Sequence, residues 1–192
     1  MSGHRGARVT VTTVELFYSI LAIIALILVG LTLVVRLLAL GSTRARSWYE
    51  AIGAIIGPGA IGMAFVVAAL ATVGSLYFSE IAHFEPCRLC WYQRIAMYPL
   101  VVILGIAAVR RDDGVSIYAR ALAGIGVIIS TYHLALEWIP SLDTGACGAG
   151  PSCSIVWFRE FGFVSLPLLA LAAFLLIFTL LSVRDPGEGD PE

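Results

Sequence analysis

Residues 51–78 read AIGAIIGPGAIGMAFVVAALATVGSLYF, an apolar run without a charged side chain. A helix needs about 20 apolar residues to cross the hydrocarbon core of a bilayer, because each residue adds about 1.5 Å. An open strand would leave backbone groups unpaired in lipid, so the run predicts a transmembrane helix. Small residues in its first half predict close packing of helices, at Gly53, Gly57, Pro58, Gly59 and Gly62.

Four other stretches resemble this one in length and hydrophobicity. They cover 14–40, 95–109 with the preceding turn from residue 89, 121–139 and 163–183. Of the 192 residues, 59% are hydrophobic and only 13% are charged, whereas a soluble domain has about a quarter charged residues. The chain is therefore predicted to be an all-α integral membrane protein with lipid as its solvent. Its net charge of −1 gives no basic footprint for nucleic acid.

The charged connections predict the orientation of the helices. The segments 41–50 and 110–120 are rich in arginine, and the positive-inside rule assigns them to the cytoplasm. The segments 79–94 and 140–162 then lie outside, and they contain all four cysteines. Outside the cytoplasm disulfides persist, so two pairs can form there. The acidic tail 184–192 is expected to be disordered and inside.

The first stretch, 14–40, makes a fifth span and leaves an N-terminal tail, 1–13, on the outer side. Arg5 and Arg8 lie in that tail, which is unusual for an outer segment. A cleaved signal peptide is the alternative, but the apolar run is much longer than the 7–15 residues of a typical signal. We expect a retained helix, and the sequence assigns it no function.

The segment 85–94, EPCRLCWYQR, contains a Cys-x-x-Cys motif. Pro86 is suited to the start of a helix, because it has no N–H to leave unsatisfied. Cys87 and Cys90 would then lie in the first turn, where free N–H groups and the helix dipole stabilise a thiolate. Thiolate is the attacking species in disulfide exchange, so this pair is predicted to be redox-active.

Arg94 follows Cys90 by four residues, so the two share one helix face. An arginine at this depth can extend to the lipid headgroups. Beside a reactive cysteine it can instead stabilise the thiolate and the negative charge of a reduced quinone, and we favour this interpretation. Gln93 could add a hydrogen bond.

Cys147 and Cys153 are separated by five residues that include two glycines and a proline. Such a turn can bring the Cα atoms to the roughly 4.4–6.8 Å that a disulfide needs. We expect an exposed disulfide in a mobile loop that a partner's thiolate can reach, the alternative being a plain loop staple. The following segment 157–160 is expected to lie on the membrane surface as a short amphipathic piece. Structural zinc commonly takes two short cysteine pairs, and this spacing does not fit, so no metal is predicted.

The run Pro-Cys-x-Leu-Cys-x-x-Gln-Arg over 86–94, continuing IAMYPL over 95–100, closely resembles the DsbB family of disulfide-forming membrane proteins. The likeness continues in YHL at 132–134 and FVSLP at 163–167 and covers 51–183. The short second cysteine spacing is similar to the short-loop, BdbC-like branch. The resemblance implies a four-helix transmembrane bundle, 51–183, to which 14–40 adds one extra helix.

The resemblance also implies a function. It predicts a thiol oxidase of the bacterial cytoplasmic (inner) membrane that reoxidises a DsbA-like thioredoxin-fold partner and reduces ubiquinone or menaquinone. Residue by residue, the resemblance assigns Cys87 and Cys90 to a quinone-coupled pair. It assigns Cys147 and Cys153 to a partner-facing pair, with Cys147 as the expected point of attack. Besides Cys90, the expected quinone-binding side chains are Arg94, His133 and Gln93.

Two other readings stay open. A vitamin K epoxide reductase-like enzyme also has a Cys-x-x-Cys and a loop pair, but there the loop pair comes first, and here it comes second. A non-catalytic membrane subunit would use both disulfides only as loop staples. That reading leaves Cys90 and Arg94 on one helix face unexplained.

Overall fold

The computed structural model of the chain describes residues 3–143, 145–148 and 150–183, with side chains from residue 11 onward. Within these ranges the fold is all helical, apart from an isolated antiparallel bridge between Glu160 and Val164. Five helical segments are long and apolar enough to cross a membrane, so the predicted fold class is confirmed. The tail 184–192 lies outside the described residues.

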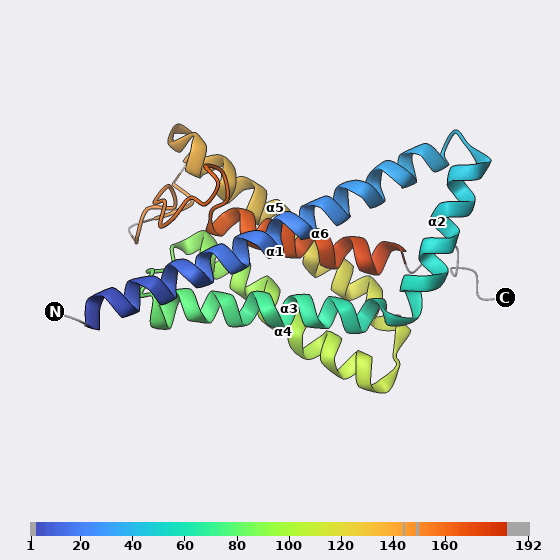
Figure 1. The fold of residues 1–192 in the computed structure, drawn as a ribbon, viewed down its shortest axis with the longest axis horizontal. Coiled ribbons are helices and arrows are strands. Elements are labelled where there is room, and N and C mark those ends of the chain that lie inside the picture. The colour runs from blue at the N-terminus through green and yellow to red at the C-terminus, as the bar shows by residue number, and fades with distance from the viewer. Residues whose placement is uncertain (1–2, 144, 149, 184–192) are drawn as a thin grey trace.

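The first five α-helices follow one another with short connections, and a long connection leads to the sixth (Figure 1). The six helices are α1 Gly3–Ala39, α2 Thr43–Ile56, α3 Ala60–Leu76, α4 Arg88–Arg110, α5 Ser116–Trp138 and α6 Leu166–Val183. Shorter helical turns lie between them, at η1 Gly57–Gly59, η2 Tyr77–Ile81, η3 Asp113–Val115 and η4 Pro140–Leu142. Helix α1 begins at Gly3, so it includes most of the segment 1–13 that the sequence analysis treated as a tail.

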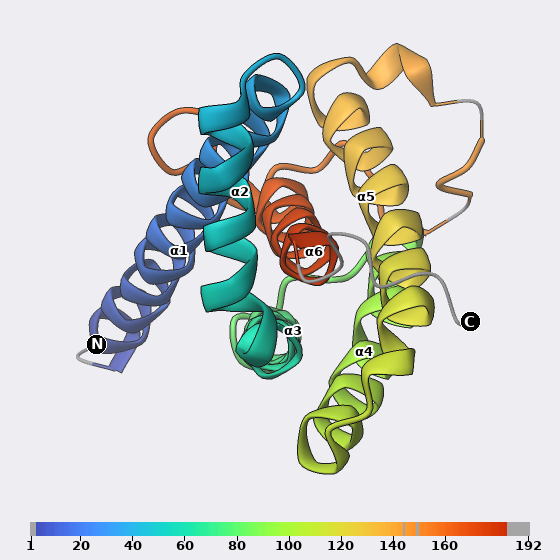
Figure 2. The ribbon, with the colours of Figure 1, turned by 90° about the vertical axis from the view of Figure 1, so that its right-hand side faces the viewer.

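The stretch 51–78 does not form one straight helix. The 3-10 turn Gly57–Gly59 divides it, with Pro58 inside the turn. Proline removes a backbone donor and crowds the preceding turn, so a helix kinks or ends there. Helix α2 consequently turns away from the axis of α3 and lies across one end of the bundle (Figures 1 and 2). The glycines and the proline thus serve a bend here as well as the close packing that was expected of them.

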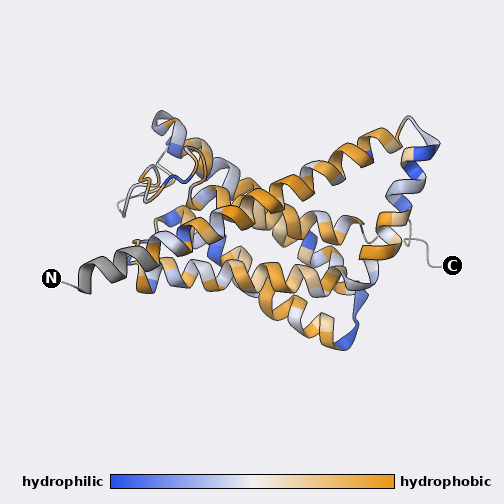
Figure 3. Ribbon diagram, viewed as in Figure 1, coloured by the Kyte–Doolittle hydropathy of each residue, from blue (hydrophilic) through white to orange (hydrophobic). Residues whose placement is uncertain are grey.

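Helices α3, α4, α5 and α6 enclose the main core. Leu100 and Leu104 of α4 and Phe174 and Ile177 of α6 are completely buried there. The outer surface is apolar as well, with exposed isoleucines and valines such as Val102 (Figure 3). Lipid satisfies such a surface and water does not.

Helix α1 packs against α6 and α2 on the outside of this four-helix core, and its Tyr18 also contacts α3 (Figure 2). Its Ala22 and Ala25 are buried against Ala172 of α6. Side chains this small bring helix backbones close, which is how helices associate in lipid. The N-terminal span, α1, is therefore an integral part of the packed structure.

Both cysteine-bearing loops lie at the same end of the bundle (Figure 1). Helix α4 begins there, and the long connection between α5 and α6 folds over it. Helix α2, with Arg44 and Arg46, and the α4–α5 connection lie at the opposite end. The cysteines and these arginines are thus separated by the length of the spanning helices.

Candidate redox site beside an apolar cavity

The Cys-x-x-Cys motif forms the start of helix α4. Cys87 is the N-cap residue, and its sulfur accepts the backbone N–H of Cys90, with an N–Sγ distance of 3.4 Å. Both residues are thiols, and their sulfurs are 3.0 Å apart. The helix begins at Arg88 and not at the expected Pro86. Cys87 caps it, because its sulfur accepts the hydrogen bond of the free backbone N–H of Cys90. Cys90 still lies in the first turn.

His133 of α5 connects the two cysteine pairs. Its Nε2 lies 3.6 Å from the sulfur of Cys87 and 3.2 Å from the carbonyl oxygen of Cys153. Its Nδ1 lies 3.3 Å from the side-chain nitrogen of Gln93. An amide nitrogen can only donate, so Nδ1 accepts and the proton of the neutral ring sits on Nε2. This tautomer directs its N–H to the Cys87 sulfur and the Cys153 carbonyl.

These contacts make Cys87 the acidic member of its pair. The hydrogen bond with the Cys90 thiol lowers the pKa of Cys87 most, and the hydrogen bond and charge interaction with His133 lower it further, against the opposing effect of burial. The N-terminal end of helix α4 also stabilises a negative charge on Cys87, through the helix dipole. Cys87 is therefore the thiolate of the motif and its stronger nucleophile at neutral pH.

Cys147 and Cys153 form a disulfide with a Cα–Cα distance of 5.9 Å. It is buried, with Cys147 3% and Cys153 2% exposed, so the expected exposed disulfide is wrong. The two sulfurs belong to one apolar cluster with Cys87, Leu89 and Leu136. Disulfide sulfur is apolar, and packing against leucines removes that surface from water.

The loop is closed over the start of α4 by specific contacts. The guanidinium of Arg88 lies directly over Gly148, where φ is +61° and a Cβ would collide with it. Tyr132 donates its hydroxyl hydrogen to the carbonyl oxygen of Leu142, at 3.2 Å. The second cysteine pair is thereby held against the first.

The segment after the disulfide includes residues 157–160, which were expected to form a short amphipathic piece on the membrane surface. It forms a turn closed by the Glu160–Val164 bridge, and aromatic rings anchor it. Trp157 stacks on Phe84 with ring centroids 4.9 Å apart, and Phe158 packs on Phe78 at 5.5 Å. Aromatic stacking within the protein thus holds this segment in place.

A buried ion pair fixes the far side of this segment. Arg159 donates to the carboxylate of Glu137 at 2.7 Å, and Ser165 donates to the other carboxylate oxygen at 2.5 Å. The Arg159 guanidinium also lies 4.2 Å above the ring of Trp138. Glu137 is buried, so its charge needs both donors.

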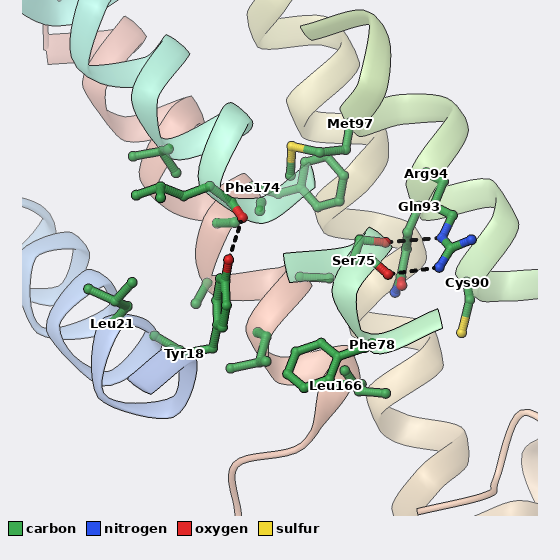
Figure 4. Close-up of a pocket in the computed structure, with 18 of the residues that line it drawn as sticks. Tyr18, Leu21, Ser75, Phe78, Cys90, Gln93, Arg94, Met97, Leu166 and Phe174 are labelled. Atoms are coloured by element: carbon green, nitrogen blue, oxygen red, sulfur yellow. Dashed lines mark hydrogen bonds between the residues drawn. The ribbon is translucent and has the colours of Figure 1, made fainter. Parts of the chain in front are cut away.

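A cavity of about 270 Å³ lies between α1, α3, α4 and α6 (Figure 4). Polar groups gather at one end of it, from Ser75 of α3 and Cys90, Gln93 and Arg94 of α4. Most of the rest of the wall is apolar, as at Leu21, Ala25, Met97 and Phe174, and Ser79 and Glu85 are further polar residues that line it. Cys90 thus lines the cavity while it also packs against the loop-disulfide cluster, and Cys87 belongs to that cluster alone.

Arg94 is held inside the protein and does not extend to the headgroups. It is 8% exposed. Its Nε donates to the hydroxyl of Ser75 and its Nη2 to the Ser75 carbonyl, both at 3.0 Å (Figure 4). The guanidinium carbon lies 5.2 Å from the ring centre of Trp91. Sequence reasoning missed Ser75, although a hydroxyl in an otherwise apolar span was a signal.

The expected quinone-binding residues divide into two groups. Cys90, Gln93 and Arg94 line the cavity. His133 is not among the residues that line it and reaches the cavity only through its hydrogen bond to Gln93. His133 is instead part of the thiol cluster.

Cys87, Cys90 and His133 offer three potential metal-ligand atoms within 4.8 Å of one another. Two thiolates and an imidazole are a donor set that Zn²⁺ accepts, with a fourth ligand still needed. A metal bound there would occupy both sulfurs, so metal binding and disulfide formation at this pair exclude each other.

Comparison with known proteins identifies this arrangement. Residues 58–183, which include all four cysteines, match the family model described as disulfide bond formation protein DsbB. The chain belongs to the DsbB family. The predicted resemblance is confirmed, and the reversed cysteine order already argued against a vitamin K epoxide reductase-like chain. Helices α1 and α2 precede the matched region of this DsbB-family protein.

Several relatives of this family member are named disulfide formation proteins. Disulfide bond formation protein C of Bacillus subtilis is 50% identical over 114 residues, which cover 59% of this chain and 83% of the relative. A probable disulfide formation protein of Oceanobacillus iheyensis is 42% identical over 128 residues, 65% of this chain and 88% of the relative. No solved structure matches the chain significantly.

Proposed function

We propose that the protein is a membrane thiol:quinone oxidoreductase that reoxidises a DsbA-like thioredoxin-fold partner. Electrons would pass from Cys147 and Cys153 to Cys87 and Cys90 and then to a membrane quinone, either ubiquinone or menaquinone. One observation carries the proposal. Cys87 is buried in the loop-disulfide cluster and does not line the cavity, whereas Cys90 packs against that cluster and also lines the cavity, so Cys90 joins the two.

The first step is exchange with the partner. A partner thiolate attacks the sulfur of Cys147, the bond to Cys153 breaks, and its electron pair leaves with Cys153. The partner's second thiolate then attacks the mixed disulfide, so the partner leaves as a disulfide and the loop pair remains as a dithiol. Because the loop disulfide is buried, the partner must first lift the loop that Arg88 and Tyr132 hold.

The second step moves the electron pair to the motif. A loop thiolate attacks Cys87, the Cys87–Cys90 bond breaks, and Cys90 leaves as a thiolate at the cavity. The second loop cysteine then restores the Cys147–Cys153 disulfide and releases Cys87, with His133 and the helix start stabilising its negative charge. The result is the arrangement described above, a loop disulfide beside two thiols.

The cavity residues fit a quinone acceptor. A quinone takes up two electrons and two protons, and an apolar chamber of about 270 Å³ is close to the low end of ligand pockets, about 300–1,000 Å³. Cys90 presents its sulfur at the polar end and delivers the electron pair as its disulfide with Cys87 re-forms. Arg94, held by Ser75, places a fixed positive charge where negative charge develops on the acceptor.

We place the cysteine-bearing end on the periplasmic or extracellular side. Support comes from Arg110 and Arg111, together with α2, at the other end of the bundle. The short connection between α4 and α5 is of the length for which positive charge sets orientation.

A thiol count tests the function. The purified protein is reduced in detergent, freed of reductant, and treated with maleimide-polymer before and after incubation with a short-chain quinone. Wild type should go from four reactive thiols to none, whereas Cys90→Ser should not pass electrons to the quinone. Arg94→Ala should need much more quinone, and Arg110→Ala at the opposite end is the matched control.

Persistence of all four thiols in wild type would support the non-catalytic reading, in which the disulfides are staples. Loss of thiols at the same rate in Cys90→Ser would mean that the quinone oxidises them without a site. Repeating the count after treatment with a chelator shows whether a bound metal protects Cys87 and Cys90.

A further inference from the structure

Helix α1 lies outside the region shared with the DsbB family, yet it forms one wall of the cavity at Cys90. We infer that α1 is a binding wall for the isoprenoid tail of the quinone and gives this protein a preference for long-tailed acceptors. The inference rests on the proposed function, because it concerns the substrate of the same cavity. It assigns a role to the one span that the family resemblance left unexplained.

The first observation is the shape of the α1 wall. Six residues of α1 line the cavity at helical spacing, as one stripe of Tyr18, Leu21, Ala22, Ile24, Ala25 and Leu28. At about 1.5 Å per residue this stripe is about 15 Å long. Figure 4 shows Tyr18 and Leu21 of α1 across the cavity from Ser75, Gln93 and Arg94, so the α1 wall belongs to the apolar part of the cavity. An elongated apolar wall suits a hydrocarbon chain, whereas a quinone ring needs only the polar end.

The second observation is that α1 is fixed in place. Tyr18 donates its hydroxyl hydrogen to the carbonyl oxygen of Leu70 in α3, at 3.1 Å. Its ring covers Gly74, where an added Cβ would lie only 2.6 Å from ring carbons. With the buried contact of Ala22 and Ala25 on Ala172, this makes two separate attachments. The wall is therefore part of the folded site, and lipid does not replace it freely.

The third observation concerns what α1 covers. Leu70 of α3 and Leu169 and Ala173 of α6 line the cavity opposite α1. In a bundle of α3 to α6 alone, these side chains would face the bilayer, and a quinone tail would lie in lipid. With α1 present, the tail exchanges lipid contacts for protein contacts on two sides. Only the affinity for the tail should therefore depend on α1, while electron transfer at Cys90 should not.

The test uses the full-length protein in lipid nanodiscs with two acceptors, a quinone with a full isoprenoid tail and the same ring without a tail. Leu21→Trp fills the wall, and Leu28→Trp fills it nearer its far end. Ile27→Trp is the control, since Ile27 is on α1, 55% exposed, and does not line the cavity. We expect Leu21→Trp and Leu28→Trp to raise KM for the tailed quinone about tenfold, a loss of about 1.4 kcal/mol in binding. KM for the tail-less ring should rise less than KM for the tailed quinone in both variants, and all values for Ile27→Trp should stay within about twofold.

A second measurement does not depend on activity or on the folding of a variant. A quinone with a photoreactive group in its tail should label α1 peptides that contain Leu21 in the wild-type protein. Unchanged KM for the tailed quinone in both variants, equal rises for both acceptors, or labelling only outside α1 would each overturn the inference. If wild type reduces neither quinone, the proposed function itself fails, which is a distinguishable result.

Discussion

The imidazole of His133 lies against the sulfur of Cys87, with Nε2 3.6 Å from Sγ, and the same nitrogen is 3.2 Å from the carbonyl oxygen of Cys153. One ring on α5 therefore touches both cysteine pairs. It stabilises the thiolate of one pair while it fixes the backbone of the other. This contact turns two separate loops into one redox unit.

The acidity of Cys87 predicts an unusual pH dependence. Because its pKa is lowered, chiefly by the Cys90 hydrogen bond and then by His133, most of Cys87 stays a thiolate as the pH falls from 8 to 6. An ordinary thiol, with a pKa of about 8.5, loses most of its reactivity over that range. Alkylation of Cys87 by iodoacetamide, followed by mass spectrometry in a variant with serines at 147 and 153, should thus be nearly constant. His133→Ala should raise the pKa of Cys87 only in part, because the larger effect of the Cys90 hydrogen bond remains, and should shift the decline in alkylation to a higher pH. A profile identical to wild type would show that the ring does not act on Cys87.

The hold of Ser75 on Arg94 predicts a graded effect on quinone use. Ser75→Ala removes the hydrogen bond to Nε but keeps the carbonyl bond to Nη2. A hydrogen bond to a charged group contributes about 1.5–3 kcal/mol. The bond to Nη2 still holds the guanidinium, so we expect only about 1 kcal/mol to be lost from quinone binding and KM to rise about threefold to tenfold. Arg94→Ala should have the larger effect, and Ser75→Thr, which keeps a hydroxyl, should stay near wild type. Steady-state quinone reduction measures all three, and an effect on kcat alone would contradict a positioning role.

The contact of Arg88 with Gly148 predicts a variant with a loosened loop. Gly148→Ala adds a Cβ that collides with the guanidinium and strains a backbone at φ +61°. We expect faster reduction of the Cys147–Cys153 disulfide by a small phosphine and slower transfer to Cys87 and Cys90. Gly145→Ala separates the two causes, since φ there is +92° but nothing lies near the added Cβ. Equal behaviour of the two variants would assign the effect to backbone strain alone.

The buried ion pair predicts a loss of stability. Glu137→Gln leaves the carboxylate's donors, Arg159 and Ser165, with a weaker acceptor in a buried place. Arg159 is partly solvated, so we expect about 1–2 kcal/mol, below the range for a fully buried pair. Thermal unfolding in detergent checks this. The double variant Glu137→Gln and Arg159→Gln should lose less than the sum of the single variants, and strict additivity would exclude coupling.

The pattern of apolar and charged residues in the sequence predicted those parts of the fold that depend on local composition. The apolar runs predicted all five spans, and the spacing of Cys90 and Arg94 predicted that both share a face, as the cavity requires. The partner of Arg94 could not be predicted, because it depends on the rotation of α3 relative to α4. The burial of the loop disulfide could not be predicted either. Glycine and proline predicted a flexible loop, but the apolar surface beneath it comes from Leu89 and Leu136 on two different helices.

Burial of the loop disulfide also makes the protein selective among reductants. The two sulfurs are only 2–3% exposed, so small thiols in solution have almost no access to them. We expect such thiols to reduce the loop disulfide slowly and to consume few of its oxidising equivalents. A protein that binds the loop widely enough to displace Arg88 from Gly148 gains access that a small molecule does not have. Under the proposed function, the closed loop therefore restricts electron transfer to a protein partner that can open it.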